Sequence, residues 1–562
     1  MTDSSFDLEM TTALGMPGAR TASALIRELA HTDPDRVAET FEGRHRTFAE
    51  LDADVTTWAK ALMAAGVQRG EAVSILAGNH PNFVTLAFAA ARVGAFLAPL
   101  NTWHTAPELQ YTVGHAPSVL LFTIDTLRKQ DFRAAWSQVL PELAARPAQP
   151  DERLRAAQLP ALLDVVSLDG GLPGATSLHG FLTAGASVTD EDLAAREALN
   201  RPEDLMYLLF TSGSTSKPKA VQLHQGHLIE NAWWIGERQG ITGEDRAWIA
   251  TPLFYGVSAM QGLFGALTHS ARIVLQEAFD PTEAVRLLEE QQCTVYYGFG
   301  NLTRKLLAVP GFDKSRIALR KGMIGFSVED RRLALDELGV TDGCSVYGMT
   351  ETYGLFALTR HDDPREIVLT SQGFALPGNE PRIVDPATGL PLPPGQVGDL
   401  QLRGRITSGY FDDDERTRAS FTHDGFFRTG DQACVDDTGR LVYHSRAVDT
   451  MKPGGINVAP QEVEALLDEV PGIAQAHVCA IPDPADGERV VAFIEADPAV
   501  TTPDFIVDHL RGRAASYKIP RHFIYRRDAD LPKLPSGKIP RPMLVHEAQV
   551  ELAPAQDETA ST

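Results

Sequence analysis

A loop of hydroxyl, glycine and lysine residues stands between two short apolar runs near the middle of the chain. The first run, Met206 to Phe210, predicts a buried strand, and the second spans Ala220 to Leu223. The loop residues that could contact an anion are Thr211, Ser212, Gly213, Ser214, Thr215 and Lys219. Glycine lets the backbone approach an anion, hydroxyls donate hydrogen bonds, and lysine adds a positive charge. The loop therefore suits a polyphosphate, although taken alone it could equally be a polar surface loop. The spacing of a Walker loop is missing.

Charge and composition limit the partners of the protein. The 562 residues exceed the size of one hydrophobic core, so two or more domains are expected. The formal net charge of -23 argues against nucleic acid or an anionic membrane surface as the main partner. An anionic substrate would need a local positive field from backbone amides, a few lysines and a metal ion.

The chain carries no evident targeting or membrane signal. Its first residues lack the basic and apolar segments of a secretory signal, and the apolar stretch 83–100 is interrupted by Arg92, which predicts a packed helix and strand. The four cysteines have no paired spacing, which indicates reduced core thiols rather than a zinc site. A cytoplasmic location is therefore expected.

The order of predicted elements indicates an α/β fold. Short apolar strands alternate with helices over 20–125 and again from 203 to about 347, a pattern typical of parallel sheets covered by helices on both faces. Residues 380–445 predict an antiparallel β subdomain. A smaller α+β unit follows, with one helix entered through Thr502 and Pro503. We expect a large N-terminal domain over 1–446, a small mobile domain over 447–548 and a disordered tail over 549–562.

Six further motifs stand in a fixed order along the chain. They are Pro252-Leu-Phe-Tyr-Gly256, Tyr347-Gly-Met-Thr-Glu351, Gly425-Phe-Phe-Arg-Thr-Gly-Asp431, Ser445-Arg446, Lys452-Pro-Gly-Gly-Ile-Asn-Val458 and Pro535-Ser-Gly-Lys-Ile539. Together with the loop they resemble the AMP-forming adenylating enzymes, which include acyl- and aryl-CoA synthetases, adenylation domains of peptide synthetases and luciferases. The resemblance covers about 22–545 and is strongest to the CoA ligases.

The resemblance implies a reaction in two halves. A carboxylate attacks the α-phosphate of ATP, which gives an acyl adenylate and pyrophosphate. A thiol, usually that of CoA, then takes the acyl group and releases AMP. The small domain rotates between the halves, so that two of its faces serve one active site in turn.

Roles for the nucleotide-binding residues follow from the resemblance. The loop from Thr211 to Lys219 would cover the β- and γ-phosphates, and Tyr347, Gly348 and Met349 would line the nucleotide site, with Tyr347 against the adenine. Thr350 would hydrogen-bond the α-phosphate, and Glu351 would bind Mg²⁺, which prefers carboxylate oxygens. Asp431 would accept hydrogen bonds from the ribose hydroxyls. Arg446 would also contact the ribose.

The resemblance also implies roles for residues of the small domain. Lys538 would bridge the substrate carboxylate and the α-phosphate in the first half-reaction. Gly454 and Gly455 would line the pantetheine tunnel in the second half-reaction, where a side chain would intrude. Val448 stands at the expected hinge.

The acid-binding pocket is predicted from aromatic and small residues. The candidates are Trp233, Trp234, Tyr255, Gly256, Gly298, Phe299, Gly300, Gly325, Phe326 and Gly348. The two tryptophans could equally belong to the core. Because the set contains no evident charge to pair with a second ionic group, an aromatic or medium-length apolar acid is expected.

Departures from the family pattern leave the acceptor open. Ser216 and Ala220 replace glycines, and Tyr255 replaces a gating histidine. Val448 replaces a polar hinge residue, and the β-branched side chain of Val448 restricts the backbone. Ile456 replaces a common glutamate, and the segment 323–327 is bulkier than usual. CoA is the expected acceptor. Alternatives are a carrier-protein thiol, an amine, an internal nucleophile or a diazotase-type reaction of nitrite, and a non-catalytic family member is a further alternative. The sequence does not indicate an oligomeric state.

Overall fold

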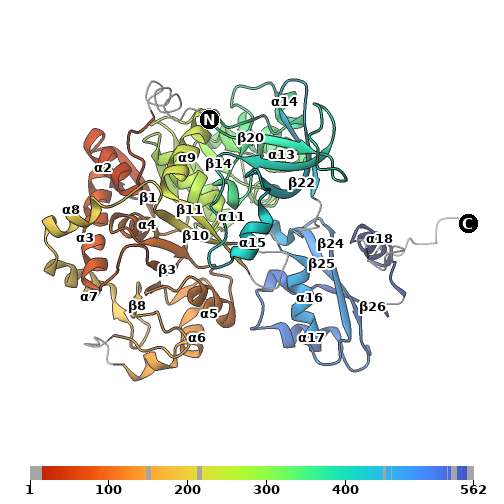
Figure 1. The fold of residues 1–562 in the computed structure, drawn as a ribbon, viewed down its shortest axis with the longest axis horizontal. Helices are drawn as coiled ribbons and strands as arrows, with labels where there is room; N and C mark the ends of the chain where they lie inside the picture. Colours follow the sequence, from red (N-terminus) through yellow and green to blue (C-terminus); the bar gives the residue numbers. More distant parts are fainter. Residues whose placement is uncertain are drawn as a thin grey trace, which may run out of the picture. The chain divides into compact units, whose positions relative to one another are not determined.

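The chain consists of two compact units. A computed structural model describes residues 16–146, 153–211, 218–446, 451–456, 458–527, 530–532, 539 and 541–552. The larger unit comprises 1–102, 109–210 and 219–445, and the smaller unit includes the chain from Arg446 onward. The two units are described separately below (Figure 1).

Two seven-stranded sheets form the framework of the larger unit. The first has the order β11 (Lys219–His224), β10 (Leu205–Thr211), β4 (Phe96–Pro99), β3 (Ala72–Leu76), β5 (Leu120–Thr123), β8 (Asp164–Ser167) and β9 (Thr176–Ser177). The second has the order β16 (Asp342–Cys344), β15 (Lys321–Met323), β14 (Val295–Tyr297), β12 (Arg246–Ile249), β13 (Arg272–Leu275), β1 (Val37–Phe41) and β2 (Arg44–Thr47). Parallel pairs dominate both sheets, as the alternating sequence pattern predicts.

Smaller antiparallel sheets complete the larger unit. They are β17 (Val346–Tyr347), β18 (Ala357–Leu358) and β19 (Phe374–Ala375); β20 (Glu380–Val384), β21 (Gly398–Arg403), β22 (Phe427–Val435) and β23 (Leu441–Arg446); and β6 (Thr126–Leu127) with β7 (Gln130–Asp131). The four strands β20–β23 are the antiparallel part expected over 380–445. Their core contains Ile383, Leu400, Leu402 and Phe427 and also includes Tyr347 from β17.

Helices cover the sheets of the larger unit. They are α2 (Ala22–Thr32), α3 (Phe48–Ala64), α4 (Pro81–Arg92), α5 (Ala106–His115), α6 (Phe132–Val139), α7 (Leu178–Ala184), α8 (Asp190–Glu197), α9 (Gln225–Gln239), α10 (Leu263–Leu267), α11 (Pro281–Gln291), α12 (Gly300–Leu307), α13 (Val328–Leu333), α14 (Arg365–Thr370) and α15 (Asp414–Ser420). Short 3₁₀ turns are η1 (Pro141–Ala145), η2 (Gly185–Ser187), η4 (Lys314–Arg316) and η6 (Thr350–Thr352), and π-helical segments are η3 (Val257–Gly262) and η5 (Ala334–Leu338).

The apolar stretch 83–100 folds as the sequence predicts. Pro81 stands at the first position of α4, where its missing N–H has no intrahelical role, and the residues from Phe83 to Arg92 are buried. β4 follows and is buried along its whole length. In Figure 1, α2, α3 and α4 pack together at the red, N-terminal end of the chain. Among the described helices, none is long and apolar enough to cross a membrane.

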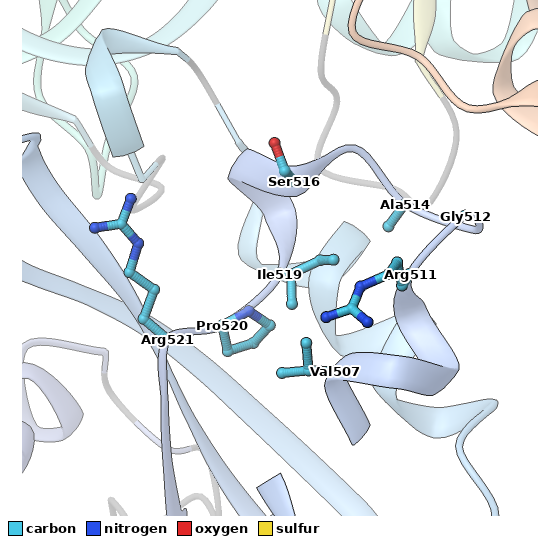
Figure 2. A pocket seen from close by; sticks show the side chains of 8 residues that line it. All are labelled: Val507, Arg511, Gly512, Ala514, Ser516, Ile519, Pro520 and Arg521. Carbon is cyan, nitrogen blue, oxygen red and sulfur yellow. The ribbon is translucent and has the colours of Figure 1, made fainter. Parts of the chain in front are cut away.

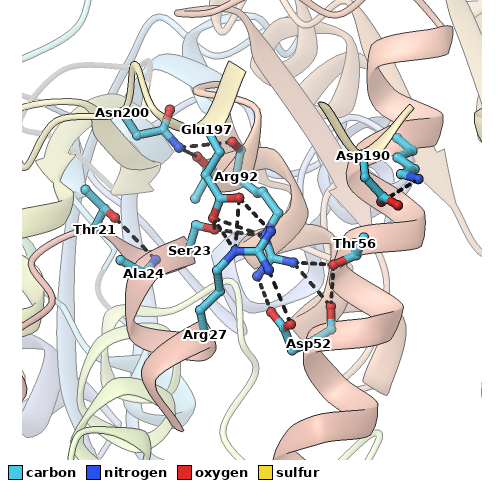
Figure 3. A network of polar contacts seen from close by, with 12 residues as sticks. Thr21, Ser23, Ala24, Arg27, Asp52, Thr56, Arg92, Asp190, Glu197 and Asn200 are labelled. Atoms are coloured by element: carbon cyan, nitrogen blue, oxygen red, sulfur yellow. Dashed lines mark hydrogen bonds and ion pairs between the residues drawn. The ribbon is translucent and has the colours of Figure 1, made fainter. Parts of the chain in front are cut away.

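A buried arginine joins four of these helices (Figure 3). The guanidinium of Arg92 is fully buried and donates to Asp52 of α3, to Ser23 of α2 at 2.8 Å and to Thr56 at 2.7 Å. Ser23 donates in turn to Glu197 at the end of α8. A guanidinium can be buried only where its charge and donors are satisfied, so this network specifies how the helices pack.

The smaller unit is an α+β domain. It contains β24 (Gln475–Asp483), β25 (Gly487–Glu495) and β26 (His522–Tyr525) in one sheet, with α16 (Pro460–Asp468), α17 (Pro503–Leu510) and α18 (Arg541–Glu551), and the 3₁₀ turns η7 (Pro453–Gly455) and η8 (Ser516–Lys518). Thr502 caps α17 by accepting from the Phe505 N–H at 3.3 Å, and Pro503 follows it, as predicted.

Candidate active site

The phosphate-loop candidate connects two adjacent strands. β10 ends at Thr211 and β11 begins at Lys219, and the strands are neighbours in the first sheet. Both apolar runs are thus strands, as the sequence predicts. Ser212, Gly213, Ser214 and Thr215 lie outside the described residues, so their role stays a prediction. Ala220, one of the departures, is buried within β11.

A short segment that sequence reasoning missed pairs with β11. Tyr410 forms an antiparallel bridge with Val221, and the Phe411 N–H donates to the Ala220 carbonyl at 2.9 Å. The ammonium of Lys219 lies 5.2 Å from the centre of the Tyr410 ring, within the range of a cation–π contact. The signal that could have found Tyr410 is weak, because it is a short aromatic pair, Tyr410 and Phe411, between Gly409 and an acidic loop.

Tyr410 also reaches the predicted metal-binding carboxylate. Its hydroxyl donates to Oε1 of Glu351 at 2.9 Å. Burial, together with the nearby carboxylate, raises the pKa of Tyr410, so the phenol remains a donor at neutral pH. The structure therefore brings Lys219 and Glu351, which are far apart in sequence, into contact with one tyrosine, the lysine with its ring and the carboxylate with its hydroxyl.

The turn that carries Thr350 and Glu351 is closed tightly on itself. A Cβ on Gly348 would collide with the carbonyl oxygen of Gly354, so only glycine fits there. Tyr353 ends the 3₁₀ turn at φ 55°, a left-handed conformation that is rare for an aromatic residue. Its fully buried side chain holds it in place, with its hydroxyl accepting from the His224 N–H at 3.2 Å. Backbone strain of this kind is typical of positions that the surroundings fix for function.

Asn231 of α9 anchors the same turn from the other side. Its side-chain amide is buried and donates to the carbonyls of Thr352, Tyr353 and Leu355 at 3.3, 3.2 and 2.9 Å. The backbone carbonyl of Glu351 also accepts from the Thr407 N–H at 2.7 Å. These bonds fix the backbone from which Thr350 and Glu351 project.

The residues at this turn fit the Mg²⁺ that the family uses. Mg²⁺ is usually held by one or two carboxylates together with substrate phosphates rather than by a protein cage. Within the described residues no cluster of three or more His, Cys, Asp or Glu side chains could hold a metal by itself. Glu351 is 8% exposed, and only its Oε1 takes part in a hydrogen bond among the described residues. The second oxygen would then be the atom that ligates a metal, and this role of Glu351 stays a prediction.

The predicted adenine and ribose residues are in contact with each other. The hydroxyl of Tyr347 donates to Oδ2 of Asp431 at 2.7 Å. The Tyr347 ring also stacks on Tyr443 of β23, with ring centres 6.0 Å apart, a partner that the sequence did not indicate. Asp431 lies in β22 and is 5% exposed. Gly348 and Met349, also predicted for this site, continue directly from Tyr347.

Part of the predicted acid pocket adjoins Thr350. A Cβ on Gly256 would lie 2.5 Å from the methyl of Met260 and 3.8 Å from the hydroxyl of Thr350. The segment then continues as the π-helix η3, a rare form that is frequent at functional sites. The Tyr255 hydroxyl accepts from the side-chain amide of Asn101 at 3.3 Å. The acid candidates Tyr255 and Gly256 therefore lie beside the phosphoryl candidate Thr350.

The two tryptophans are mainly core residues. Trp233 is 1% and Trp234 8% exposed, and their rings contact edge to face with centres 4.7 Å apart. Trp233 also stacks on His269. Of the two interpretations of the sequence, packing is thus the better supported for Trp233, and Trp234 keeps a small exposed edge.

The remaining acid candidates include two stacked phenylalanines and two glycines that lie close to a carboxylate. Phe299 and Phe326 stack with ring centres 5.2 Å apart. A Cβ on Gly325 would lie 2.7 Å from the Cβ of Asp330, and a Cβ on Gly300 would overlap its carboxylate. Asp330 pairs with Arg304 at 3.1 Å. The candidates themselves carry no charge, but the first turn of α13 places the ion pair of Asp330 and Arg304 beside Gly300 and Gly325. At Gly298, an added Cβ would overlap the hydroxyl of Tyr296, so this position also favours glycine.

The tunnel candidates of the smaller unit form a left-handed turn. Gly454 and Gly455 have φ values of 62° and 83°, which favour glycine. The Gly454 N–H donates to the Asp486 carbonyl at 2.9 Å. The hinge candidate Val448 and the catalytic candidate Lys538 lie outside the described residues, as does the side chain of Arg446. The roles assigned to these three residues stay predictions.

A hollow in the smaller unit is separate from these candidates. It is an open depression of about 520 Å³, lined by residues of α17 and the chain that follows it (Figure 2). Its two arginines are already paired, Arg511 with Asp508 at 2.7 Å and Arg521 with Asp486 at 2.6 Å. The lining contains none of the residues predicted for the nucleotide, the acid or the thiol.

Comparison with known proteins identifies the class. Residues 26–411 match the AMP-binding enzyme family and residues 462–538 match the AMP-binding enzyme C-terminal domain. The chain is 31% identical over 536 residues to the acyl-CoA ligase SID4 of Ajellomyces capsulatus, covering 92% of this chain and 89% of that one. It is 28% identical over 530 residues to the mitochondrial medium-chain acyl-CoA ligase ACSF2 of Danio rerio, covering 92% and 87%. The amide bond synthetase McbA of Marinactinospora thermotolerans superposes with a TM-score of 0.76 at 25% identity, covering 94% and 99%.

The chain therefore belongs to the AMP-binding enzyme family. It is an AMP-forming acid–thiol ligase, which activates a carboxylic acid with ATP as an acyl adenylate and transfers the acyl group to CoA, with Mg²⁺ as cofactor.

Proposed function

We propose that the tyrosine-centred arrangement of Lys219 and Glu351 binds the triphosphate of ATP in the first half-reaction. The observation that supports this most directly is that one ring, Tyr410, contacts both the lysine ammonium and the metal-suited carboxylate. A cation and a carboxylate suited to Mg²⁺, both in contact with this tyrosine, suit the binding of a chain of phosphates. When bound through Glu351, Mg²⁺ would neutralise phosphate charge as the leaving pyrophosphate develops.

The other predicted nucleotide-binding residues each bind a different part of ATP. Asp431 accepts hydrogen bonds from the ribose hydroxyls, and its Oδ2 is fixed by Tyr347. The Tyr347 ring lies against the adenine. Thr350, held by the closed turn, donates to the α-phosphate. Lys538 bridges the substrate carboxylate and the α-phosphate, and the phosphate loop and Arg446 complete the site.

We propose a neutral, apolar tail for the acid substrate. Beside Thr350 the pocket candidates are Tyr255 and Gly256, and the other group contains the stacked rings of Phe299 and Phe326. Asp330 adds a negative charge to that second group, which Arg304 compensates at the surface. A second carboxylate on the substrate would meet this charge unfavourably. An aromatic or medium-length monocarboxylic acid is thus the proposed substrate class.

CoA is the acceptor at the glycine turn of the smaller unit. The left-handed turn at Gly454 and Gly455 presents no side chain to a pantetheine arm. Rotation of the small domain about Val448 would bring Lys538 to the active site for the first half-reaction and this turn for the second. We place the reaction in the cytoplasm, because the four cysteines are all buried and their positions show no paired spacing. A carrier-protein thiol remains an alternative acceptor for the test below.

Product analysis with an acid library tests this proposal. Benzoate, hexanoate and octanoate are compared with malonate and succinate, each with ATP and Mg²⁺, with and without CoA. We expect AMP and pyrophosphate with the monocarboxylic acids, and an acyl-CoA only when CoA is present. Preference for the dicarboxylic acids would contradict the proposed substrate class. Adenylates that form but never transfer to CoA would instead support another acceptor.

A further inference from the structure

Tyr410 occupies a central position that its sequence context does not indicate. It lies outside the six motifs, on the chain between β21 and α15, yet its side chain is 4% exposed. Its hydroxyl donates to Oε1 of Glu351 at 2.9 Å, and its ring faces the ammonium of Lys219 at 5.2 Å. One side chain thus contacts two residues that are 132 positions apart by their numbering, 351 and 219.

The backbone around Tyr410 fixes the side chain. Its own N–H donates to the hydroxyl of Thr417 at 2.9 Å. The adjacent Gly409 carbonyl accepts from the Gln222 N–H of β11 at 3.2 Å. Thr407 ties the same segment to both functional elements, because its N–H donates to the Glu351 carbonyl and its hydroxyl donates to the Gln222 carbonyl, each at 2.7 Å. The position of the phenol is therefore set by the same strand that carries Lys219.

The hydrogen bond from the Tyr410 hydroxyl affects the orientation of the Glu351 carboxylate. The terminal torsion of a glutamate has a broad distribution, so a hydrogen bond to one oxygen narrows the orientations of the carboxylate. With Oε1 held by the phenol, the carboxylate plane is fixed and Oε2 is the oxygen that remains for a metal. Partners that orient a metal ligand in this way typically influence metal affinity about 10- to 100-fold.

We propose that Tyr410 is a positioning residue that orients Glu351 for the metal and holds Lys219 beside the same phosphates. The proposal rests on the proposed roles of Glu351 and Lys219. The hydroxyl acts on the metal ligand, and the ring acts on the lysine. The two contributions are therefore separable by substitution.

Two variants separate the hydroxyl from the ring. Tyr410→Phe removes the hydrogen bond and keeps the ring, and Tyr410→Leu removes both. The metal probe is Mn²⁺, whose binding to the enzyme with a non-hydrolysable ATP analogue is followed by its paramagnetic resonance signal. We expect Tyr410→Phe to weaken Mn²⁺ binding about 10-fold, while binding of the analogue without metal stays unchanged. Tyr410→Leu should also weaken the metal-free binding of the analogue, because the ring beneath Lys219 is lost.

Matched controls distinguish this role from a general effect on folding. Tyr525→Phe removes a comparable phenol, whose hydroxyl donates to the Thr501 carbonyl at 2.6 Å in the smaller unit, and should leave Mn²⁺ binding unchanged. Thermal unfolding of each variant is measured alongside, and binding is measured at a temperature at which all variants are folded. Mn²⁺ affinity of Tyr410→Phe within twofold of the wild type would overturn the inference.

A further variant separates failure of the inference from failure of the proposed function. Glu351→Gln should weaken Mn²⁺ binding more than Tyr410→Phe does, because it removes the ligand itself. If Glu351→Gln binds Mn²⁺ as the wild type does, the proposed metal role of Glu351 is wrong. If Glu351→Gln loses binding and Tyr410→Phe does not, only the role of Tyr410 is wrong.

Discussion

The phenol of Tyr347 donates a 2.7 Å hydrogen bond to Asp431, which lies 84 residues further along the chain. The contact joins β17 to β22, two strands of different antiparallel sheets. It also holds one carboxylate oxygen of the proposed ribose ligand. The adenine and ribose candidates therefore form one preorganised unit rather than two independent contacts.

Removing this hydrogen bond should weaken nucleotide binding. Tyr347→Phe keeps the aromatic ring and leaves Asp431 without its phenol donor. We expect the KM for ATP to rise about threefold to tenfold, since a hydrogen bond to a charged group typically contributes about 1.5–3 kcal/mol and Asp431 keeps other contacts. The measurement is acid-dependent pyrophosphate release at varied ATP. An unchanged KM would show that the contact is structural only.

Adding a single methyl group at Gly348 should disrupt the turn that carries Thr350 and Glu351. The new Cβ would overlap the Gly354 carbonyl, so the turn must open. Overpacking of this kind typically costs about 1–3 kcal/mol of stability. We expect Gly348→Ala to lower the thermal midpoint of the larger unit and to abolish pyrophosphate release. Gly18→Ala, whose Cβ would meet its nearest neighbour at 4.0 Å, is the matched control and should behave as the wild type.

The buried guanidinium of Arg92 should make the N-terminal helices sensitive to loss of Asp52. Removing one partner of a buried pair typically costs about 3–5 kcal/mol. We expect Asp52→Ala to lower the free energy of unfolding by about 3 kcal/mol, the low end of this range, because Glu197 remains 3.7 Å from the guanidinium. Denaturant unfolding measures the loss. Glu380→Ala breaks an ion pair with Arg403 in which the two side chains are 54% and 52% exposed, and it should produce no measurable change.

The same network should lose strength in acid through Glu197. Burial acts to raise the pKa of this carboxyl, but hydrogen bonds from Arg27 and Ser23 and the charge of Arg92 outweigh burial and lower the pKa. A carboxyl with a lowered folded-state pKa stabilises the protein above its unfolded pKa of about 4.3 and loses that contribution as pH falls through the folded value. The stability gap between wild type and Glu197→Gln, measured by denaturant unfolding, should therefore shrink between pH 6 and pH 3. A gap independent of pH would contradict this assignment.

The sequence predicts the elements of the site better than the contacts between them. The runs 206–210 and 220–223 are strands because continuous apolar residues favour the buried parallel sheet, and Thr502 caps a helix because its hydroxyl accepts a free N–H. These are local effects, so the local sequence is sufficient. The resemblance to a family assigns roles to Tyr347, Glu351 and Asp431 through their motifs, and these roles stay predictions.

Tyr410 and Asp330 were missed for a different physical reason. Tyr410 acquires its role through a strand bridge to Val221, a pairing over 189 positions that no periodic pattern encodes. Ser327 caps the start of α13 by accepting from the Asp330 N–H, and this first turn places the Asp330 carboxylate beside Gly300 and Gly325. In both cases the chain path, rather than residue spacing, brings the side chain to the site.

The two half-reactions should separate through two residues of the smaller unit. Lys538→Ala should lower adenylate formation by about 10²–10³, the range expected for one preorganised charge-stabilising donor. It should leave transfer from a supplied acyl adenylate to CoA nearly intact, because the proposed rotation moves Lys538 away for that step. Lys129→Ala, an exposed lysine of the larger unit, is the control and should leave both steps unchanged.

Gly455→Trp should have the opposite effect. Its bulk would block the proposed pantetheine path, so adenylate formation should persist while CoA transfer is lost. Since Gly455 has φ 83°, any side chain there also strains the backbone. Gly512→Trp is the matched control, because Gly512 has φ 80° and no atom within 4 Å of an added Cβ, and it should retain both steps. If Gly455→Trp transfers to CoA as the wild type does, the tunnel lies elsewhere. If Gly512→Trp also loses transfer, the effect of Gly455→Trp is one of strain, and the path of the thiol must be sought away from this turn.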